Sequence, residues 1–369
     1  MKIMMLIDSL VRGGRERRLL ELLKAFSQRE GIQTVLVLFS RRVEYEEIKQ
    51  MDLPIYYLDR KPAKDPRVFY RLWQLCKKER PDVLHCWGWM PAVYAVPTAL
   101  HLNIPLLNAS ISDAPHDLHW GDPRYFRARI TFPFSKAIVG NSKAGLNVYD
   151  APKSKSYCIY NGFDFQRIKH LEAPDCIRKK LNIQSKYIVG MVGAFYKRKD
   201  YVTFLRAAQE VLEQGTDVTF LAIGDGPTLE QMKNKVPPAY KDRILFTGLM
   251  SNVESIVNCF DIGVLTTYTE GISNAIMEYM VLGKAVITTG SGGIREIVQD
   301  GHTGYALPSG SWLQLADYII QLLEDDQLRQ AIGQRGKALI YEQFSLDRME
   351  KEYLDLYGLL TNGKIPIFA

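Results

Sequence analysis

The sequence of 369 residues lacks several motifs that would each point to a particular chemistry. No two aspartates are spaced D-x-D, so the common carboxylate device for holding a metal–diphosphate complex is missing. No G-x-G-x-x-G joins a predicted strand to a helix, which disfavours a nicotinamide dinucleotide fingerprint. No Ser-His-Asp or Cys-His arrangement stands out. We therefore expect no metal, no cofactor and no nicotinamide dehydrogenase.

Cysteine and long apolar runs are also scarce. The five cysteines are scattered, and none forms C-x-x-C or pairs with a histidine at ligand spacing, so we expect reduced thiols. The longest apolar runs are too short to span a bilayer, and polar and basic residues directly follow the first eight residues, unlike a signal peptide. These features favour a cytoplasmic protein.

Positive charge is concentrated in the first half of the chain. Residues 1–160 hold 25 Lys and Arg against 16 Asp and Glu, or +9, whereas residues 161–369 hold 22 against 25, or −3. A basic half joined to a mildly acidic half favours two domains and suggests that the basic one faces anionic ligands or an anionic membrane surface. The basic residues are spread out and carry no nucleic-acid-binding motif, so no nucleic-acid partner is expected.

Short β-rich runs alternate with helical stretches along the whole chain, which predicts α/β architecture with parallel sheets covered by helices. The predicted strands of the first half are 3–7, 33–39, 55–58, 82–86, 104–110, 137–142 and 157–162. A polar stretch at 163–186 suits a linker. The same rhythm then restarts with strands at 187–193, 218–224, 243–248, 262–267, 285–290 and 303–307.

The predicted helices follow the same alternation and include one at 293–299. The pattern predicts two Rossmann-like doubly wound domains facing across a cleft, at residues 1–165 and 166–348. The amphipathic tail, 349–369, is expected to pack back on the first domain. In such sheets ligands bind outside the carboxyl ends of the strands, so the loops after strands are expected to carry the function.

Glu278 is the only charged residue in the otherwise apolar or small stretch G-I-S-N-A-I-M-E-Y-M-V-L-G, residues 271–283. Ser273 and Asn274 suit a helix start and Gly283 a helix end, so Glu278 is predicted to be buried on a core helix. A buried carboxylate costs several kcal/mol unless something specific pairs with it. Glu270 lies eight residues earlier, in the loop that enters the helix. Two carboxylates around a helix N-terminus suggest a polyhydroxylated, anionic ligand.

Three further features suggest contacts to phosphate or substrate. Lys199 lies between a strand and a helix, a usual place for a cation that grips phosphate. Arg12, Gly13 and Gly14 follow the first predicted strand, where glycines let the backbone approach a phosphate closely. His85 ends a strand and is either a substrate contact or a core histidine.

The segment H-W-G-D-P-R-Y-F-R-A-R-I-T-F-P-F-S-K, residues 119–136, mixes aromatic and basic residues. It suits an anionic lipid surface or a phosphate-bearing acceptor. Its alternative interpretation is a solvated face with ordinary core aromatics.

Taken together, these motifs resemble the retaining GT-B glycosyltransferases of family 4, the glycosyl transferase group 1 type. The resemblance covers almost the whole chain, from Gly13-Gly14 through N-S-K-A-G (141–145), I-Y-N-G-F-D (159–164), V-G-A-F-Y-K-R-K-D (192–200), A-I-G-D-G-P (222–227) and F-T-G (246–248) to G-H-T-G-Y (301–305). Its most specific part is the E-x7-E pair within E-G-I-S-N-A-I-M-E (270–278).

The resemblance implies roles for these residues. Glu270 would contact the donor sugar near the reacting face, Glu278 the ribose hydroxyls, and Lys199 the diphosphate. The backbone of Gly271, Ile272, Ser273 and Asn274 and the Gly13-Gly14 loop would complete the phosphate site. The chain departs from the family at two positions: Ala194 stands where the family usually has an arginine, and Ser112 stands where its acceptor-side histidine would fall.

The sequence thus predicts a retaining, metal-independent glycosyltransferase. It would move a sugar from a nucleotide-diphosphate sugar, expected to be UDP-linked, to a saccharide or lipid-linked saccharide. The catalytic candidates are Glu270 and Lys199, and the acceptor-side candidates are Arg12, His85 and Ser112. Two alternatives remain open: a nucleotide-sugar epimerase of the same fold, and a catalytically weak nucleotide-sugar-binding partner in a polysaccharide-assembly complex. The predicted location is cytoplasmic, with peripheral attachment to the inner membrane face as an option.

Overall fold

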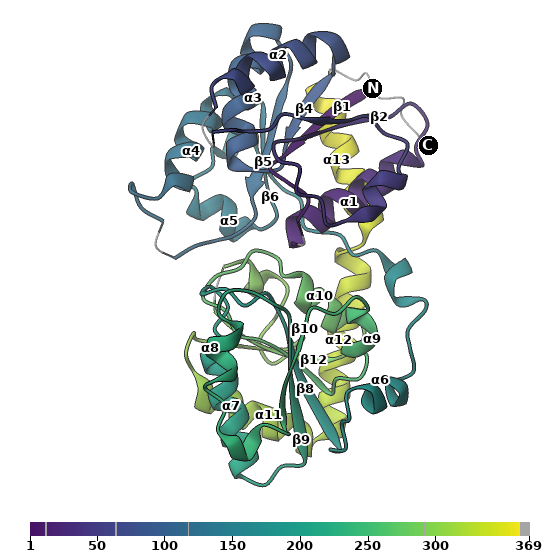
Figure 1. Ribbon diagram of the computed structural model, residues 1–369, viewed down its shortest axis with the longest axis vertical. Helices are drawn as coiled ribbons and strands as arrows, with labels where there is room; N and C mark the ends of the chain where they lie inside the picture. Colours follow the sequence, from purple (N-terminus) through teal and green to yellow (C-terminus); the bar gives the residue numbers. More distant parts are fainter. Residues whose placement is uncertain (12, 63–64, 117, 291, 362–369) are drawn as a thin grey trace. The chain divides into compact units, whose positions relative to one another are not determined.

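The computed structural model describes residues 1–11, 13–62, 65–116, 118–290 and 292–361. The chain forms two compact α/β units (Figure 1). The first comprises Met1–Gly162 together with the chain from Leu346 onward, and the second is Phe163–Ser345. The boundaries predicted from the sequence, after residues 165 and 348, each fall three residues beyond these.

The first unit is built on a seven-stranded parallel sheet in the order β3-β2-β1-β4-β5-β6-β7. All seven strands predicted for this half are present. Five of them are largely buried, and buried parallel strands are continuous apolar runs that stand out in a sequence. The strands are β1 Lys2–Ile7, β2 Gln33–Leu38, β3 Ile55–Tyr57, β4 Val83–Cys86, β5 Leu106–Ile111, β6 Ala137–Gly140 and β7 Ser156–Cys158. The helices are α1 Gly14–Ser27, α2 Arg67–Glu79, α3 Trp89–Leu102, α4 Pro123–Thr131, α5 Lys143–Val148 and α13 Leu346–Leu360.

Helix α13 returns to the first unit, as was predicted for the tail; residues 362–369 of that tail lie outside the described residues. It lies beside α1 (Figure 1) and buries Met349, Tyr353, Leu356 and Tyr357 in the core formed by α1 and one face of the sheet. The unit is therefore completed by chain from both ends of the sequence.

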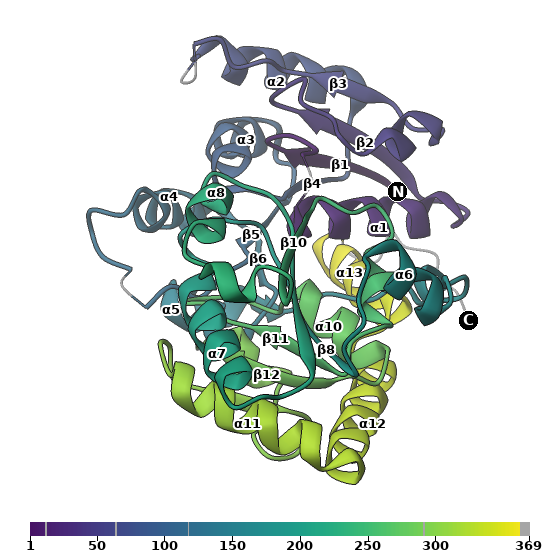
Figure 2. The ribbon, with the colours of Figure 1, turned by 60° about the horizontal axis from the view of Figure 1, so that its bottom comes forward.

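The second unit is a six-stranded parallel sheet in the order β10-β9-β8-β11-β12-β13. Helices α7 and α11 pack together on one face, and α10 and α12 on the other (Figures 1 and 2). The strands are β8 Tyr187–Val192, β9 Val218–Ile223, β10 Ile244–Gly248, β11 Ile262–Leu265, β12 Ala285–Thr289 and β13 Tyr305–Leu307. The helices are α6 Pro174–Lys180, α7 Tyr201–Glu213, α8 Leu229–Lys233, α9 Val253–Val257, α10 Asn274–Val281, α11 Trp312–Glu324 and α12 Asp326–Gln343.

Two predictions about elements need correction. The stretch 163–186 is part of the second unit rather than a plain linker, since it contains the 3₁₀ turn η4 (Phe165–Ile168) and helix α6. The helix predicted at 293–299 is a short 3₁₀ turn, η6 (Gly293–Glu296). The chain then turns at Gly301, with φ 68°, before β13 begins. Among the described residues, no helix is long and apolar enough to span a membrane.

His85 on β4 is a core residue, and the prediction of an acceptor-side contact is corrected. Its side chain is 0% exposed, and its Nδ1 lies 2.7 Å from the hydroxyl of Tyr357 on α13. Trp87 and Tyr353 pack against its ring. Its Nε2 has no hydrogen-bond partner in the part of the chain that is described. Burial lowers the pKa of His85 to about 3, so the ring is neutral in the folded protein.

This burial predicts a pH dependence of stability. The unfolded chain binds a proton at His85 below about pH 6.5, whereas the folded chain binds it only below about pH 3. The free energy of unfolding therefore falls as the pH drops through this window. We expect the parent to lose about 2 kcal/mol more than His85→Gln between pH 6.5 and 4.5, because glutamine keeps a hydrogen-bonding group for Tyr357 but does not titrate.

Urea unfolding at the two pH values measures this difference. The control is His302→Gln, since His302 is exposed. An equal pH dependence in the parent and His85→Gln would contradict the assignment.

Candidate functional site

The predicted site residues of the second unit gather where the strand order of its sheet reverses. Strands β8 and β11 are neighbours in the sheet but not in the sequence. The strands that follow β8 in the chain, β9 and β10, lie on one side of this pair, and those that follow β11, β12 and β13, lie on the other. The loop after β8 carries Lys199, and the loop after β11 carries Glu270. Such reversal points leave a crevice at the carboxyl ends of the strands, where open α/β sheets bind their ligands.

Backbone hydrogen bonds fasten the two loops to each other. The amide of Asp200 donates to the carbonyl oxygen of Thr266 at 3.0 Å, and the amide of Tyr268 donates to that of Arg198 at 3.0 Å. The hydroxyl of Thr267 also donates to Arg198 at 3.0 Å. Lys199 therefore lies between two residues, Arg198 and Asp200, that are hydrogen-bonded to the loop after β11. This places the Lys199 side chain against that loop.

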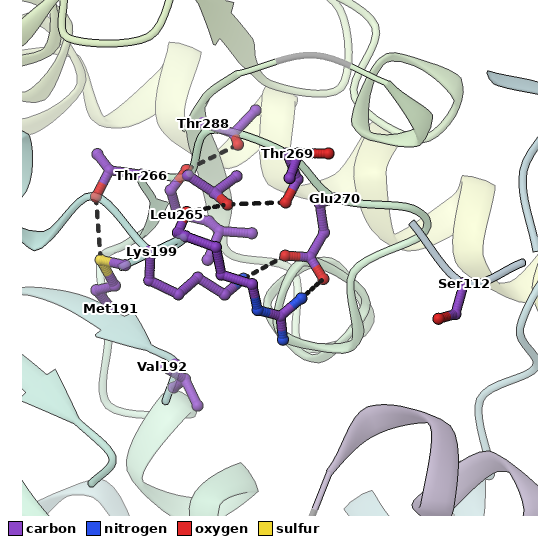
Figure 3. A network of polar contacts seen from close by, with 12 residues as sticks. Ser112, Met191, Val192, Lys199, Leu265, Thr266, Thr269, Glu270 and Thr288 are labelled. Carbon is purple, nitrogen blue, oxygen red and sulfur yellow. Dashed lines mark hydrogen bonds and ion pairs between the residues drawn. The ribbon is translucent and has the colours of Figure 1, made fainter. Parts of the chain in front are cut away.

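Lys199 and Glu270 form an ion pair that is largely shielded from solvent (Figure 3). Lys199 Nζ donates to Glu270 Oε2 at 2.6 Å, and the two side chains are 7% and 14% exposed. Arg198 lies at 3.8 Å from the other carboxylate oxygen and is 53% exposed. Burial lowers the pKa of Lys199, although Glu270 opposes the shift. Burial would raise the pKa of Glu270, but Lys199 and Arg198 outweigh it and hold that pKa below its usual range.

The turn after β8 is held rigidly. The Tyr201 hydroxyl donates to the carbonyl oxygen of Gly193 at 2.5 Å, and the Tyr201 ring stacks on Phe195 at 3.8 Å between centroids. Gly224, at the end of β9, has φ 140°, and a Cβ there would lie 2.1 Å from the Gly193 carbonyl oxygen. Only glycine fits at that approach. Ala194 next to this turn is exposed.

Helix α10 begins directly beside Glu270. Its first turn follows Gly271, Ile272 and Ser273, all buried, and Ser273 makes no side-chain cap to the helix. The backbone amides at a helix start favour an anion. Every residue from Ala275 to Val281 is buried, which confirms the prediction of a core helix.

Glu278, in the middle of α10, is 3% exposed and meets the partner that its burial requires. Arg167 Nη2 donates to Glu278 Oε1 at 2.7 Å and also pairs with Glu254 on α9. Neither Arg167 nor Glu254 belongs to the residues predicted for the site. Arg167 lies in the stretch interpreted as a linker, and no spacing rule connects it to carboxylates 87 and 111 residues away.

The predicted glycines and Ser112 of the first unit follow the carboxyl ends of its strands. Gly13 precedes α1 with an extended backbone, φ −165°, and Gly14 is the exposed first residue of that helix. Ser112 directly follows β5 and is exposed. Arg12 lies outside the described residues.

Two protein families match the chain, one in each unit. The family model described as Glycosyltransferase Family 4 matches residues 12–167, and that described as Glycosyl transferases group 1 matches residues 175–339. Together the two matched ranges contain all of the predicted site residues.

Curated relatives match over part of their length. The chain is 30% identical to N-acetyl-alpha-D-glucosaminyl L-malate synthase of Bacillus anthracis over 58% of the chain and 57% of that protein. It is 25% identical to alpha-D-kanosaminyltransferase of Streptomyces kanamyceticus over 49% of the chain and 48% of that protein. The chain thus spans about half the length of the curated relatives that it matches.

A solved structure matches over nearly the full chain. Anabaena HepE in complex with UDP-glucose is 20% identical, with a TM-score of 0.81, over 97% of this chain and 99% of that one. With its two parallel α/β units, the chain therefore has the GT-B fold.

Proposed function

The chain belongs to the group 1, family 4 glycosyltransferases of the GT-B fold, and from that premise we propose its reaction. It transfers a sugar from a UDP-linked donor to a saccharide or lipid-linked saccharide, with retention at the anomeric carbon. The observation that carries the proposal is the Lys199–Glu270 pair at 2.6 Å beside the start of α10, eight residues before the buried Glu278. A relative named alpha-D-kanosaminyltransferase and a fold neighbour crystallised with UDP-glucose support it.

The donor's diphosphate is assigned to Lys199 and to the backbone from Gly271 to Asn274. Lys199 is pinned by its loop and little exposed, so its charge acts in a medium of lower dielectric than water. When a diphosphate arrives, Lys199 exchanges Glu270 for the phosphate oxygens. Hydrogen-bond donors that are already in place around the departing diphosphate stabilise the negative charge that develops on it in the transition state.

The two glutamates are assigned to different parts of the donor. Glu278 accepts hydrogen bonds from the ribose hydroxyls, and Glu270, released from Lys199, orients the sugar and assists the positive charge that develops on it. No nucleophile on the enzyme is assigned. In the first unit, Gly13 and Gly14 are proposed as backbone contacts to phosphate, and Ser112 and Arg12 as acceptor-side residues.

A cationic side chain and helix-end amides supply the charge that a divalent metal would otherwise bring to the diphosphate. We propose that turnover needs no metal, so the assays below are run in EDTA.

The first test separates the two glutamates by the release of UDP from a panel of UDP-sugars. We expect Glu278→Gln to raise the donor KM more than it lowers kcat, since it acts on a part of the donor that does not react. We expect Glu270→Gln to lower kcat and kcat/KM together. The rise in KM for Glu278→Gln and the fall in kcat for Glu270→Gln should each be about ten- to a hundredfold, as expected when one hydrogen bond to a charged group is removed.

Glu230→Gln serves as the matched control because Glu230 is exposed on α8 of the same unit. Melting temperatures check that the variants fold. Folded variants that both keep parental turnover would refute the proposal. Binding of UDP-sugar without any release of UDP by the parent would favour the second candidate, a non-catalytic binding partner, which the exposed Ala194 in place of an arginine supports.

We also propose that the first unit docks on the anionic inner surface of a membrane from the cytoplasm. Around α4 it exposes the large apolar side chains of Trp120 (84%), Phe126 (60%), Ile130 (38%) and Phe134 (48%). Phe126 and Ile130 are four residues apart and share a helix face. Lys136, Lys143 and Lys153, which follow α4 in the sequence, are exposed. Interfacial aromatic and aliphatic groups combined with lysines favour anionic bilayers.

Co-sedimentation with vesicles of phosphatidylserine and phosphatidylcholine tests this surface. We expect the double variant Trp120→Ser/Phe126→Ser to bind these vesicles at least about fivefold more weakly than the parent, since it removes buried apolar area at the interface. Leu313→Ser is the control, because Leu313 is 53% exposed on α11 of the other unit. Equal binding of parent and double variant, or equal binding to vesicles of phosphatidylcholine alone, would contradict the proposal.

A further inference from the structure

Arg167 is the side chain that joins the 3₁₀ turn η4 to the two carboxylates beside it. Its Nη2 donates to Glu278 Oε1 at 2.7 Å, and the same nitrogen pairs with Glu254 Oε1. The side chains of Arg167, Glu254 and Glu278 are 16%, 11% and 4% exposed. The ring of Phe163 lies 4.8 Å from the guanidinium carbon.

This arrangement places one cation between two carboxylates that are largely removed from water. Without the guanidinium, Glu254 and Glu278 would present like charges to each other across a site where water screens them poorly. A planar guanidinium also fixes direction, since its N–H groups point along set lines and a carboxylate must turn to meet them. Arg167 therefore sets both the charge balance around Glu278 and the direction of its carboxylate.

The direction matters because of what Glu278 is proposed to recognise. Two neighbouring ribose hydroxyls can both donate to one carboxylate only if its plane is suitably turned, and a misplacement of about 1 Å at such a contact lowers its value sharply. Every residue from Ala275 to Val281 on the helix that carries Glu278 is buried, so packing restrains its backbone. The side-chain torsions remain, and Arg167 restrains them.

We propose that Arg167 is a positioning residue for the nucleotide: it orients Glu278 toward the ribose hydroxyls of the donor, and Glu254 on the neighbouring helix α9 pairs with it as well. The inference rests on the proposed function, because it assigns Arg167 a task in the recognition of the same nucleotide. The competing explanation is a structural brace that only fastens η4 to α9 and α10.

The experiment compares the binding of UDP and of 2′,3′-dideoxy-UDP by calorimetry in EDTA. The parent should prefer UDP by about ten- to a hundredfold, since the dideoxy compound cannot donate to Glu278. In Arg167→Gln this preference should shrink to about threefold or less, while the affinity for dideoxy-UDP stays within about twofold of the parent's. A brace would lower both affinities in the same proportion or neither.

Two further variants keep the test decisive if Arg167→Gln folds poorly. The double variant Arg167→Gln/Glu254→Gln removes one positive and one negative charge, so it retains the parent's net charge and strands no like-charged pair. It should lose the ribose preference as well. Glu254→Gln alone leaves Arg167 on Glu278 and should keep most of the preference. Arg243→Gln is the control, since Arg243 pairs with Asp217 near the edge of the same unit.

The outcomes separate the two claims. A parent that binds UDP no better than dideoxy-UDP would overturn the ribose role of Glu278 and this inference with it. A parent that discriminates, combined with an undiminished preference in folded Arg167→Gln or in the double variant, would overturn the inference alone and leave the proposed function standing.

Discussion

A carboxylate taken out of water must be paired, and this constraint shapes the carboxyl edge of the second sheet. Glu270 and Glu278 flank the start of one helix, and each meets a cation at hydrogen-bond distance, Lys199 at 2.6 Å and Arg167 at 2.7 Å. The cations come from different parts of the chain, so the fold must deliver each of them accurately. Because removing one partner of a buried pair is far more costly than forming the pair is favourable, the elements that deliver the cations are tightly constrained.

The surrounding structure can be understood as support for these pairs. Tyr279, next to Glu278 on α10, accepts a hydrogen bond from the amide of Val192 at the end of β8 and so ties the helix to the strand that precedes Lys199. The carbonyl oxygen of Glu270 accepts from the amide of Gly293 at 3.1 Å, which joins its loop to the Gly-rich turn after β12. Both pairs therefore sit on backbone that is fixed from more than one side, as a preorganised binding site requires.

Much of this could be predicted from the sequence, and the exceptions have a common cause. Strands, the core helix around Glu278 and the loop positions of Lys199 and Glu270 follow from local patterns of a few residues. Arg167 could not be found in that way, because its partners lie 87 and 111 residues further along the chain. His85 posed the same difficulty: a histidine at a strand end is a site residue or a core residue according to what covers it, and Tyr357, 272 residues away, decides that here.

The most direct test of the central claim is a crystal structure of the protein with UDP, grown in EDTA. The account predicts a diphosphate oxygen within hydrogen-bond distance of Lys199 Nζ, the Lys199–Glu270 pair opened, and the ribose hydroxyls on the Glu278 carboxylate with Arg167 still bound to it. A diphosphate held elsewhere, with Lys199 still on Glu270 and the ribose away from Glu278, would contradict it.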